Sequence, residues 1–135
     1  MADILIVEDD PAVSMTLALI VEADGHQSRI APNGAAGLEL LRERIPDLTV
    51  TDIEMPVRDG PSMALQMFLE DHGLERVPIV LLSGFPDIGD IARDVGTPYY
   101  LSKPFDIDRL REIVERALRE RVFPVPQPRQ KTESS

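Results

Sequence analysis

Short runs of apolar residues recur along the chain, and between them apolar residues return every three or four positions. Four of these runs are largely apolar at successive positions, which is typical of strands buried on both faces of a parallel sheet. They cover residues 4–7, 48–51, 79–82 and 99–101. A weaker run, Ser28–Ile30, has fewer apolar residues and is predicted to be an edge strand.

The stretches between the runs are predicted to be helices. Pro11 lies near the start of the first helix, where its missing N–H costs little, and Gly73 is the expected C-cap of the third. Asp106 is the predicted N-cap of the last helix. The expected buried stripes are Val13, Leu17, Ile20 and Val21; Leu38, Leu41 and Ile45; Ala64, Met67 and Phe68; and Ile107, Leu110, Ile113, Val114, Ala117 and Leu118.

Strand and helix thus alternate five times along the chain. Such alternation predicts an α/β fold, with a five-stranded, doubly wound parallel sheet and right-handed crossovers. A length of 135 residues suits one domain, which we expect at residues 1–121. From Val122 prolines alternate with other residues and polar residues follow, so residues 122–135 are predicted to be a flexible tail or linker.

The composition excludes several classes of protein. A formal net charge of -10 argues against direct binding of nucleic acid, which needs clustered Lys and Arg. The acidic balance suits a cation site or a basic partner, and equally a plain soluble surface. No cysteine is present, no signal peptide is evident and no apolar run approaches the roughly 20 residues that span a bilayer. We therefore expect a cytoplasmic protein without a membrane partner.

Polar side chains follow the predicted strands at their carboxyl ends, where ligands bind in open α/β sheets. They are Glu8, Asp9 and Asp10 after the first run, Asp52 at the end of the third, Ser83 at the end of the fourth, and Lys103 after the fifth. Because parallel strands end at one edge of a sheet, we expect carboxylates, a hydroxyl and an ammonium group to meet there.

This set of groups suits phosphoryl transfer. Carboxylates that lie close together repel one another unless a cation holds them, and oxygen ligands with open positions suit Mg²⁺. A carboxylate such as Asp52 can act as a nucleophile and form an aspartyl phosphate. The metal ion and Lys103 would neutralise charge on the transferred group, and Ser83 would donate a hydrogen bond to it.

Four motifs occur in order at these predicted strand ends. They are Ile4-Leu5-Ile6-Val7-Glu8-Asp9-Asp10-Pro11, Asp52-Ile53-Glu54-Met55-Pro56-Val57-Arg58-Asp59-Gly60, Ser83-Gly84 and Lys103-Pro104-Phe105. Together they resemble the response-regulator receiver (CheY-like) family of two-component signalling systems, and the second resembles its phosphorylation loop. The resemblance covers about residues 3–120. It implies the flavodoxin-like strand order 2-1-3-4-5 and a phosphorylation-dependent switch.

The resemblance also assigns roles to individual residues. Glu8 and Asp9 would hold Mg²⁺ (or Mn²⁺), with Asp52 and the backbone carbonyl of Glu54 completing the metal site. Asp52 would accept the phosphoryl group, and Ser83 and Lys103 would contact its oxygens.

Two further roles follow from the resemblance. The Lys103–Pro104 bond is expected to be cis. Tyr100 stands at the family's switch aromatic, which turns inward when the residue at Ser83 is drawn toward the phosphate. The alternative is that Tyr100 is a half-buried core aromatic that does not switch.

The implied partners are a phosphoryl donor and a target. A sensor histidine kinase or a histidine phosphotransfer protein would donate the phosphoryl group. The protein would catalyse its own phosphorylation and dephosphorylation without turning over a separate substrate. Its target would be a downstream protein or an output domain missing from this chain, and a phosphorylation-dependent dimer is among the expected assemblies.

The chain departs from the family pattern at two places. The segment from Ser83 to Lys103 is shorter by about one helical turn or less, and only Ile88, Ile91, Ala92 and Val95 support a helix there. That helix is expected to be short, bent or mobile. Glu54 and Phe85 stand where the family flanks the phosphoryl group, so Glu54→Ala is expected to change the autodephosphorylation rate.

Other functions remain to be weighed. A Mg²⁺-dependent aspartyl-phosphate phosphatase would favour a second aspartate two residues after its nucleophile, where this chain has Glu54. A pseudo-receiver that binds partners without phosphorylation would not need the full set of Asp52, Ser83 and Lys103. A flavin-binding protein of similar fold would need a Ser/Thr-rich phosphate loop after the first strand, which is absent.

Overall fold

The computed structural model describes residues 1–53, 76–84 and 86–124 of the chain. The predicted third helix, with Ala64, Met67, Phe68 and its C-cap Gly73, lies outside the described residues. Glu54, Phe85 and residues 125–135 also lie outside them, so the division of the chain at residue 121 stays a prediction.

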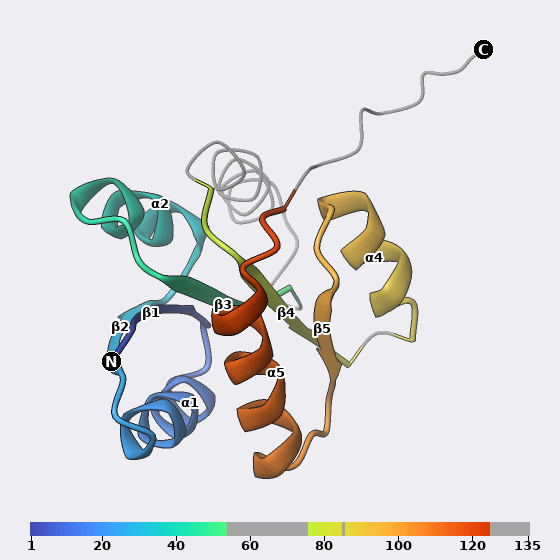
Figure 1. Cartoon of the computed structure of the whole chain (residues 1–135), viewed down its shortest axis with the longest axis horizontal. Helices are drawn as coiled ribbons and strands as arrows, with labels where there is room; N and C mark the ends of the chain where they lie inside the picture. Colours follow the sequence, from blue (N-terminus) through green and yellow to red (C-terminus); the bar gives the residue numbers. More distant parts are fainter. Residues whose placement is uncertain (54–75, 85, 125–135) are drawn as a thin grey trace.

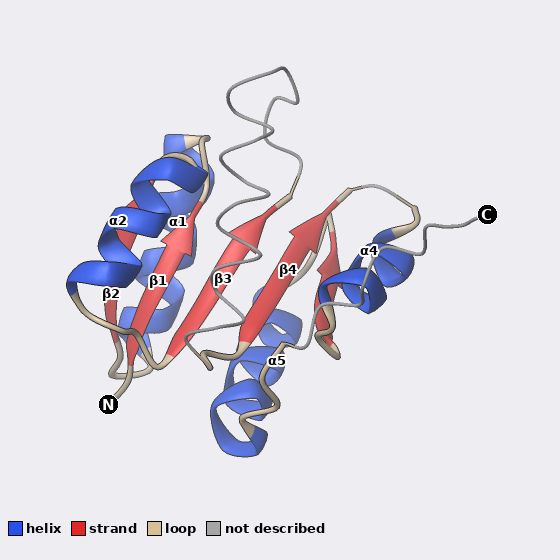
Figure 2. Cartoon of the chain, turned by 90° about the horizontal axis from the view of Figure 1, so that it is seen from above, coloured by secondary structure: helices blue, strands red, loops and turns tan. Residues whose placement is uncertain are grey.

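Five parallel strands form a single sheet in the order β2-β1-β3-β4-β5, which confirms the predicted fold class and strand order. The strands are β1 (Asp3–Val7), β2 (Gln27–Ala31), β3 (Leu48–Asp52), β4 (Ile79–Ser83) and β5 (Tyr99–Ser102). Figure 2 shows β1, β3 and β4 pointing the same way, so that their carboxyl ends lie along one edge. The weak second run is an edge strand, as predicted.

Helices cover both faces of the sheet (Figure 1). The described helices are α1 (Pro11–Ala23), α2 (Gly34–Glu43), α4 (Ile88–Val95) and α5 (Ile107–Glu120). The buried residues of α1 and α5 pack on one face, against Ile4 and Ile6 of β1, while those of α2 and α4 pack on the other, against Leu5 and Val7. Because both faces are covered, strands β3 and β4 are buried at every position.

Local sequence signals explain where the helices begin and end. Pro11 is the first residue of α1, and the Asp10 carboxylate accepts the N–H of Ala12 as its N-cap. Asp106 caps α5 through the N–H of Arg109, as predicted. Helix α4 has only eight residues and ends at Gly96, whose φ of 88° favours glycine, so the prediction of a short fourth helix is confirmed. No described helix combines the length and apolarity that a membrane span requires.

Two predicted core positions are wrong. Ile45 and Ile107 are 56% and 55% exposed. Helix α2 ends at Glu43 because Arg44 is extended, and a residue before proline, such as Ile45, avoids the helical conformation. Ile107 is the first residue of α5. A helical side chain covers the turn before its own position, and no turn precedes Ile107.

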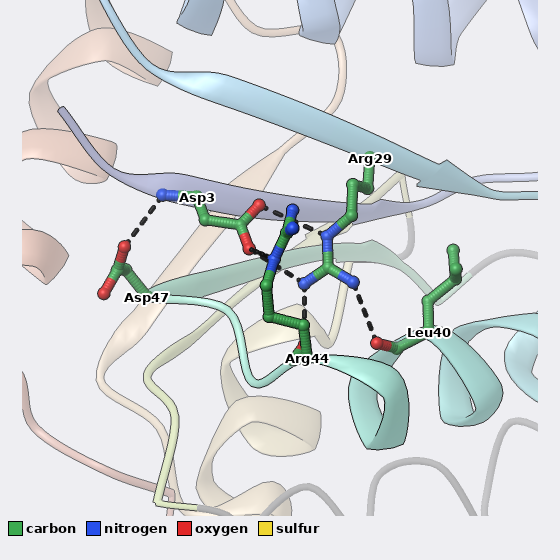
Figure 3. Close-up of polar contacts among 5 residues, drawn as sticks. All are labelled: Asp3, Arg29, Leu40, Arg44 and Asp47. Carbon is green, nitrogen blue, oxygen red and sulfur yellow. Dashed lines mark hydrogen bonds and ion pairs between the residues drawn. The ribbon is translucent and has the colours of Figure 1, made fainter.

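A polar network fastens the amino-terminal edge of the sheet (Figure 3). The Asp3 carboxylate accepts two hydrogen bonds from Arg29, at 3.2 and 3.0 Å, and one from Arg44 at 3.1 Å. Arg29 also donates to the backbone carbonyls of Leu40 and Arg44, while Asp47 accepts the N–H of Asp3. Strand β1, strand β2 and the end of α2 are thus joined through one guanidinium group.

Replacing Arg29 by methionine is expected to lower the free energy of unfolding by about 2 kcal/mol. The change keeps an aliphatic stem but leaves the Asp3 carboxylate, whose side chain is only 15% exposed, with one fewer cation. It also removes one hydrogen-bond donor from each of the Leu40 and Arg44 carbonyls. Urea unfolding measures the difference. The matched control is Arg93→Met in the exposed Asp90–Arg93 pair, which should change stability by less than about 0.5 kcal/mol. Equal effects would contradict the role given to Arg29.

Candidate functional site

The candidate site lies where the strand order reverses, a usual place for ligands in open α/β sheets. Strand β1 has β2 on one side and β3 on the other. Val7 pairs with Thr51 in the β1–β3 ladder. Glu8 and Asp52, which come directly after these two residues, therefore lie at the same edge of the sheet. The predicted meeting of these two carboxylates therefore results from the register of the sheet.

Three acidic side chains come together at this edge. One carboxylate oxygen each of Glu8, Asp9 and Asp52 lies within 4.8 Å of the others. Glu8 and Asp52 are buried, at 2% and 4% exposure, whereas Asp9 is exposed. Two buried acids and one exposed acid form a cluster that is open to solvent on the side of Asp9.

A lysine supplies positive charge to the acidic cluster. Lys103 Nζ lies 2.9 Å from Oδ2 of Asp52 and 3.7 Å from Oε1 of Glu8. Its backbone N–H donates to the carbonyl of Ser83, which fixes the end of β5 to the end of β4. The Lys103–Pro104 peptide bond is cis, as predicted.

Asp10 contributes to the site through its backbone. Its N–H donates to Oε2 of Glu8 at 3.0 Å, while its carboxylate faces the first turn of α1 as the N-cap. The Asp10 carboxylate is thus used as a helix cap, and the acids grouped at the edge of the sheet are Glu8, Asp9 and Asp52.

Glu8 is the acid of the cluster whose protonation is most strongly affected by its surroundings. Burial raises the pKa of Glu8 to about 7, and the charge of Asp52 acts in the same direction, against the Asp10 N–H and Lys103. Oε1 of Glu8 has no hydrogen-bond partner among the described residues. A buried carboxylate oxygen without a donor, beside two more acids, fits a divalent cation that prefers oxygen ligands.

Stability without metal is expected to fall as pH rises from about 4.5 to about 7. Folded Glu8 holds its proton up to about pH 7, whereas the unfolded side chain loses it near 4.5. The folded state therefore binds more protons in this window, and the loss is at most on the order of 3 kcal/mol.

Urea unfolding between pH 4.5 and 8 measures this dependence, with Glu8→Gln as the control that removes the titrating group. Saturating Mg²⁺ should abolish the fall, because a cation favours charged Glu8. The same pH slope in wild type and Glu8→Gln would contradict the assignment.

The remaining predicted site residues lie in different places. Ser83 is fully buried at the end of β4, on the same edge as Asp52. Tyr100 is 42% exposed, and its role as a switch stays a prediction beside the alternative of an aromatic that does not switch. Its hydroxyl lies 3.5 Å from the position that a Cβ atom on Gly89 of α4 would occupy. The backbone carbonyl of Glu54 and the side chain of Phe85 lie outside the described residues.

The approach of Lys103 to Glu8 agrees with the expected meeting of carboxylates and an ammonium group. Sequence reasoning missed one feature of the described residues. Tyr99, at the start of β5, is fully buried and its hydroxyl donates to Glu120. Its only signal in the sequence was an aromatic residue in an apolar run.

The family model and the similar curated proteins point to the same family. The family model described as "Response regulator receiver domain" matches residues 4–115. The chain is 31% identical over 115 residues to sporulation initiation phosphotransferase F of Bacillus subtilis, covering 85% of this chain and 92% of that protein. It is 35% identical over 119 residues to the transcriptional regulatory protein PdtaR of Mycobacterium tuberculosis, covering 85% of this chain but 56% of PdtaR.

Solved structures with a similar fold belong to the same family. A CheY-like response regulator receiver domain protein from Methanospirillum hungatei aligns with a TM-score of 0.76 and 26% identity, covering 90% of this chain and 96% of that one. The chain spans about half the length or less of several regulatory proteins that it matches, such as RpaA of Synechocystis at 53%.

Proposed function

Because the chain belongs to the response regulator receiver domain family, we propose that it is a phosphorylation-dependent signalling switch whose acceptor is Asp52. The observation that carries the proposal is the position of Asp52. Its carboxylate is nearly buried, lies within 4.8 Å of two other acids and is 2.9 Å from Lys103 Nζ. A purely structural ion pair would not require three acids and one lysine at the ligand-binding edge of the sheet.

The same residues support a Mg²⁺ site. Glu8, Asp9 and Asp52 would hold the ion, and the backbone carbonyl of Glu54 stays a predicted fourth ligand. The exposure of Asp9 leaves room for water or phosphate oxygens, which Mg²⁺ usually retains. When bound, the ion supplies positive charge to the phosphoryl oxygens. Mn²⁺ fits the same oxygen ligands.

The transfer itself is a displacement at phosphorus. An oxygen of the Asp52 carboxylate forms the new bond to phosphorus, and the bond to the donor breaks with its electron pair leaving on the donor atom. Lys103 faces the oxygen charge that develops, and Ser83 would donate a hydrogen bond to one phosphoryl oxygen. Hydrolysis by water returns the Asp52 carboxylate and inorganic phosphate.

The partners belong to the proposal as well. A sensor histidine kinase or histidine phosphotransfer protein would be the donor, and a downstream protein or an output domain would read the switch. The names of PdtaR and RpaA as transcriptional regulators favour an output domain in a longer protein. The similarity to sporulation initiation phosphotransferase F favours a protein that passes its phosphoryl group onward. A cytoplasmic location and a phosphorylation-dependent dimer stay predictions.

Incubation with Mg²⁺ and acetyl phosphate tests the proposed function. Intact-mass measurement is expected to show the gain of one phosphoryl group that is stable in acid, labile in base and lost when EDTA removes the metal ion. Rapid hydrolysis would hide the product, so a parallel sample with Mg²⁺ and beryllofluoride should raise the unfolding temperature. Failure of both would favour the pseudo-receiver alternative.

A further inference from the structure

The hydroxyl of Tyr99 holds the segment that follows α5, residues 121–124. Tyr99 is fully buried, yet its hydroxyl donates to Oε1 of Glu120 at 3.0 Å and accepts the N–H of Val122 at 3.3 Å. The hydrogen bond from Tyr99 lowers the pKa of Glu120, so this carboxylate stays charged at neutral pH. One phenol therefore joins the start of β5 to the last turn of α5 and to the first residues beyond it.

Other contacts surround this anchor. The Arg116 guanidinium lies 5.3 Å from the centre of the Tyr99 ring and donates to both oxygens of Glu120. Arg121 ends α5 with a φ of 53°, an unfavourable conformation for a residue with a side chain, and donates to the carbonyl of Asp47. Surrounding contacts must offset that strain. The direction in which the chain leaves α5 is thus fixed by the domain itself.

Strand β5 connects this anchor to the candidate site. Tyr99 begins β5, and Lys103, which pairs with Asp52, directly follows the strand. At about 3.3 Å per residue, the two positions are about 13 Å apart. Strand β5 pairs only with β4 among the described strands, so it is held on one side and can shift more easily than an inner strand.

We propose that β5 couples the phosphorylation site to the segment that follows α5, residues 121–124, here called the chain exit. Tyr99 is the residue that positions this segment. The coupling rests on the proposed function, because a new charge on Asp52 would change the ion pair of Lys103 and so move the end of β5. The Tyr99 hydroxyl then transmits this movement to Glu120 and Val122. The segment that responds is this chain's own residues 121–124. Phosphorylation of Asp52 would therefore change the position of the chain exit.

The anchor itself is tested without phosphorylation. Nuclear magnetic resonance of ¹⁵N-labelled protein gives the exchange rate of the Val122 amide in wild type, Tyr99→Phe and Tyr100→Phe. Loss of one hydrogen bond is expected to speed exchange about five- to tenfold in Tyr99→Phe. Tyr100→Phe removes the neighbouring hydroxyl, which lies beside Gly89 of α4, and should leave the rate unchanged. An unchanged rate in Tyr99→Phe would overturn the anchor.

The coupling is tested by adding Mg²⁺ and beryllofluoride to wild type and Tyr99→Phe. In wild type the amides of Ile53, next to Asp52, and of Val122 should both shift, and in Tyr99→Phe only that of Ile53. A shift of Ile53 without Val122 in wild type, or a Val122 shift that persists in Tyr99→Phe, would overturn the coupling and leave the proposed function intact. No shift at either position would instead overturn the proposed function.

Discussion

An Asp52→Asn variant is expected to gain no phosphoryl group from acetyl phosphate while remaining folded. The amide that replaces the carboxylate has no charged oxygen to attack phosphorus, so the acceptor is lost rather than weakened. Asparagine has nearly the same shape, so the packing at the end of β3 should persist. Intact-mass spectra of both proteins, recorded over the same time course, measure the result.

Stability separates the loss of the acceptor from a loss of fold. The charge of Asp52 helps to raise the pKa of Glu8, so its removal should lower that pKa and relieve repulsion above neutral pH. The free energy of unfolding at pH 8 is therefore expected to be equal to or above that of wild type. Phosphoryl gain by folded Asp52→Asn would show that another residue is the acceptor.

A Lys103→Met variant is expected to be phosphorylated about 10²- to 10³-fold more slowly. Removing one preorganised charge that faces a developing oxyanion typically costs this much. Lys103 Nζ is 2.9 Å from Asp52 and 3.7 Å from Glu8, so its positive charge lies directly at the oxygens of both acids. Single time-course measurements at saturating Mg²⁺ and fixed acetyl phosphate give the rate.

Metal affinity distinguishes a role in transfer from a merely structural role. Loss of a positive charge beside three acids should leave Mg²⁺ binding unchanged or tighter, measured by titration calorimetry. A slow rate together with intact Mg²⁺ binding supports a direct role for Lys103. A wild-type rate, or a rate that falls only in parallel with metal affinity, would contradict it.

Most of the sheet and the position of the candidate site could be predicted from the sequence, because every strand follows the same pattern of an apolar run and then polar residues. Apolar runs give the strands, and the first polar residues after them, such as Glu8 and Asp52, must lie at the carboxyl edge once the strands are parallel. The resemblance to a known family then supplied the strand order, which apolar runs do not encode. The exposed, charged face of α5 likewise followed from helical spacing alone.

The failures lie where local geometry overrides periodicity. Ile45 fits the helical stripe of α2, but Pro46 ends the helix before it. Tyr99 and Tyr100 are adjacent in one apolar run, yet the alternation of a strand buries the first and exposes the second. Their different partners, Glu120 and Gly89, are set by tertiary packing, which no pattern within a single run contains.

Chemical trapping of the phosphorylated residue tests the central claim most directly. Borohydride reduces an acyl phosphate to the alcohol, so wild-type protein treated with acetyl phosphate and Mg²⁺ and then reduced should carry homoserine at position 52. Peptide mass mapping locates the change. Homoserine at position 52, absent without Mg²⁺, is the predicted result. Reduction at another aspartate, such as position 9 or 10, or at none while phosphate is incorporated, would contradict the assignment of Asp52 as the acceptor.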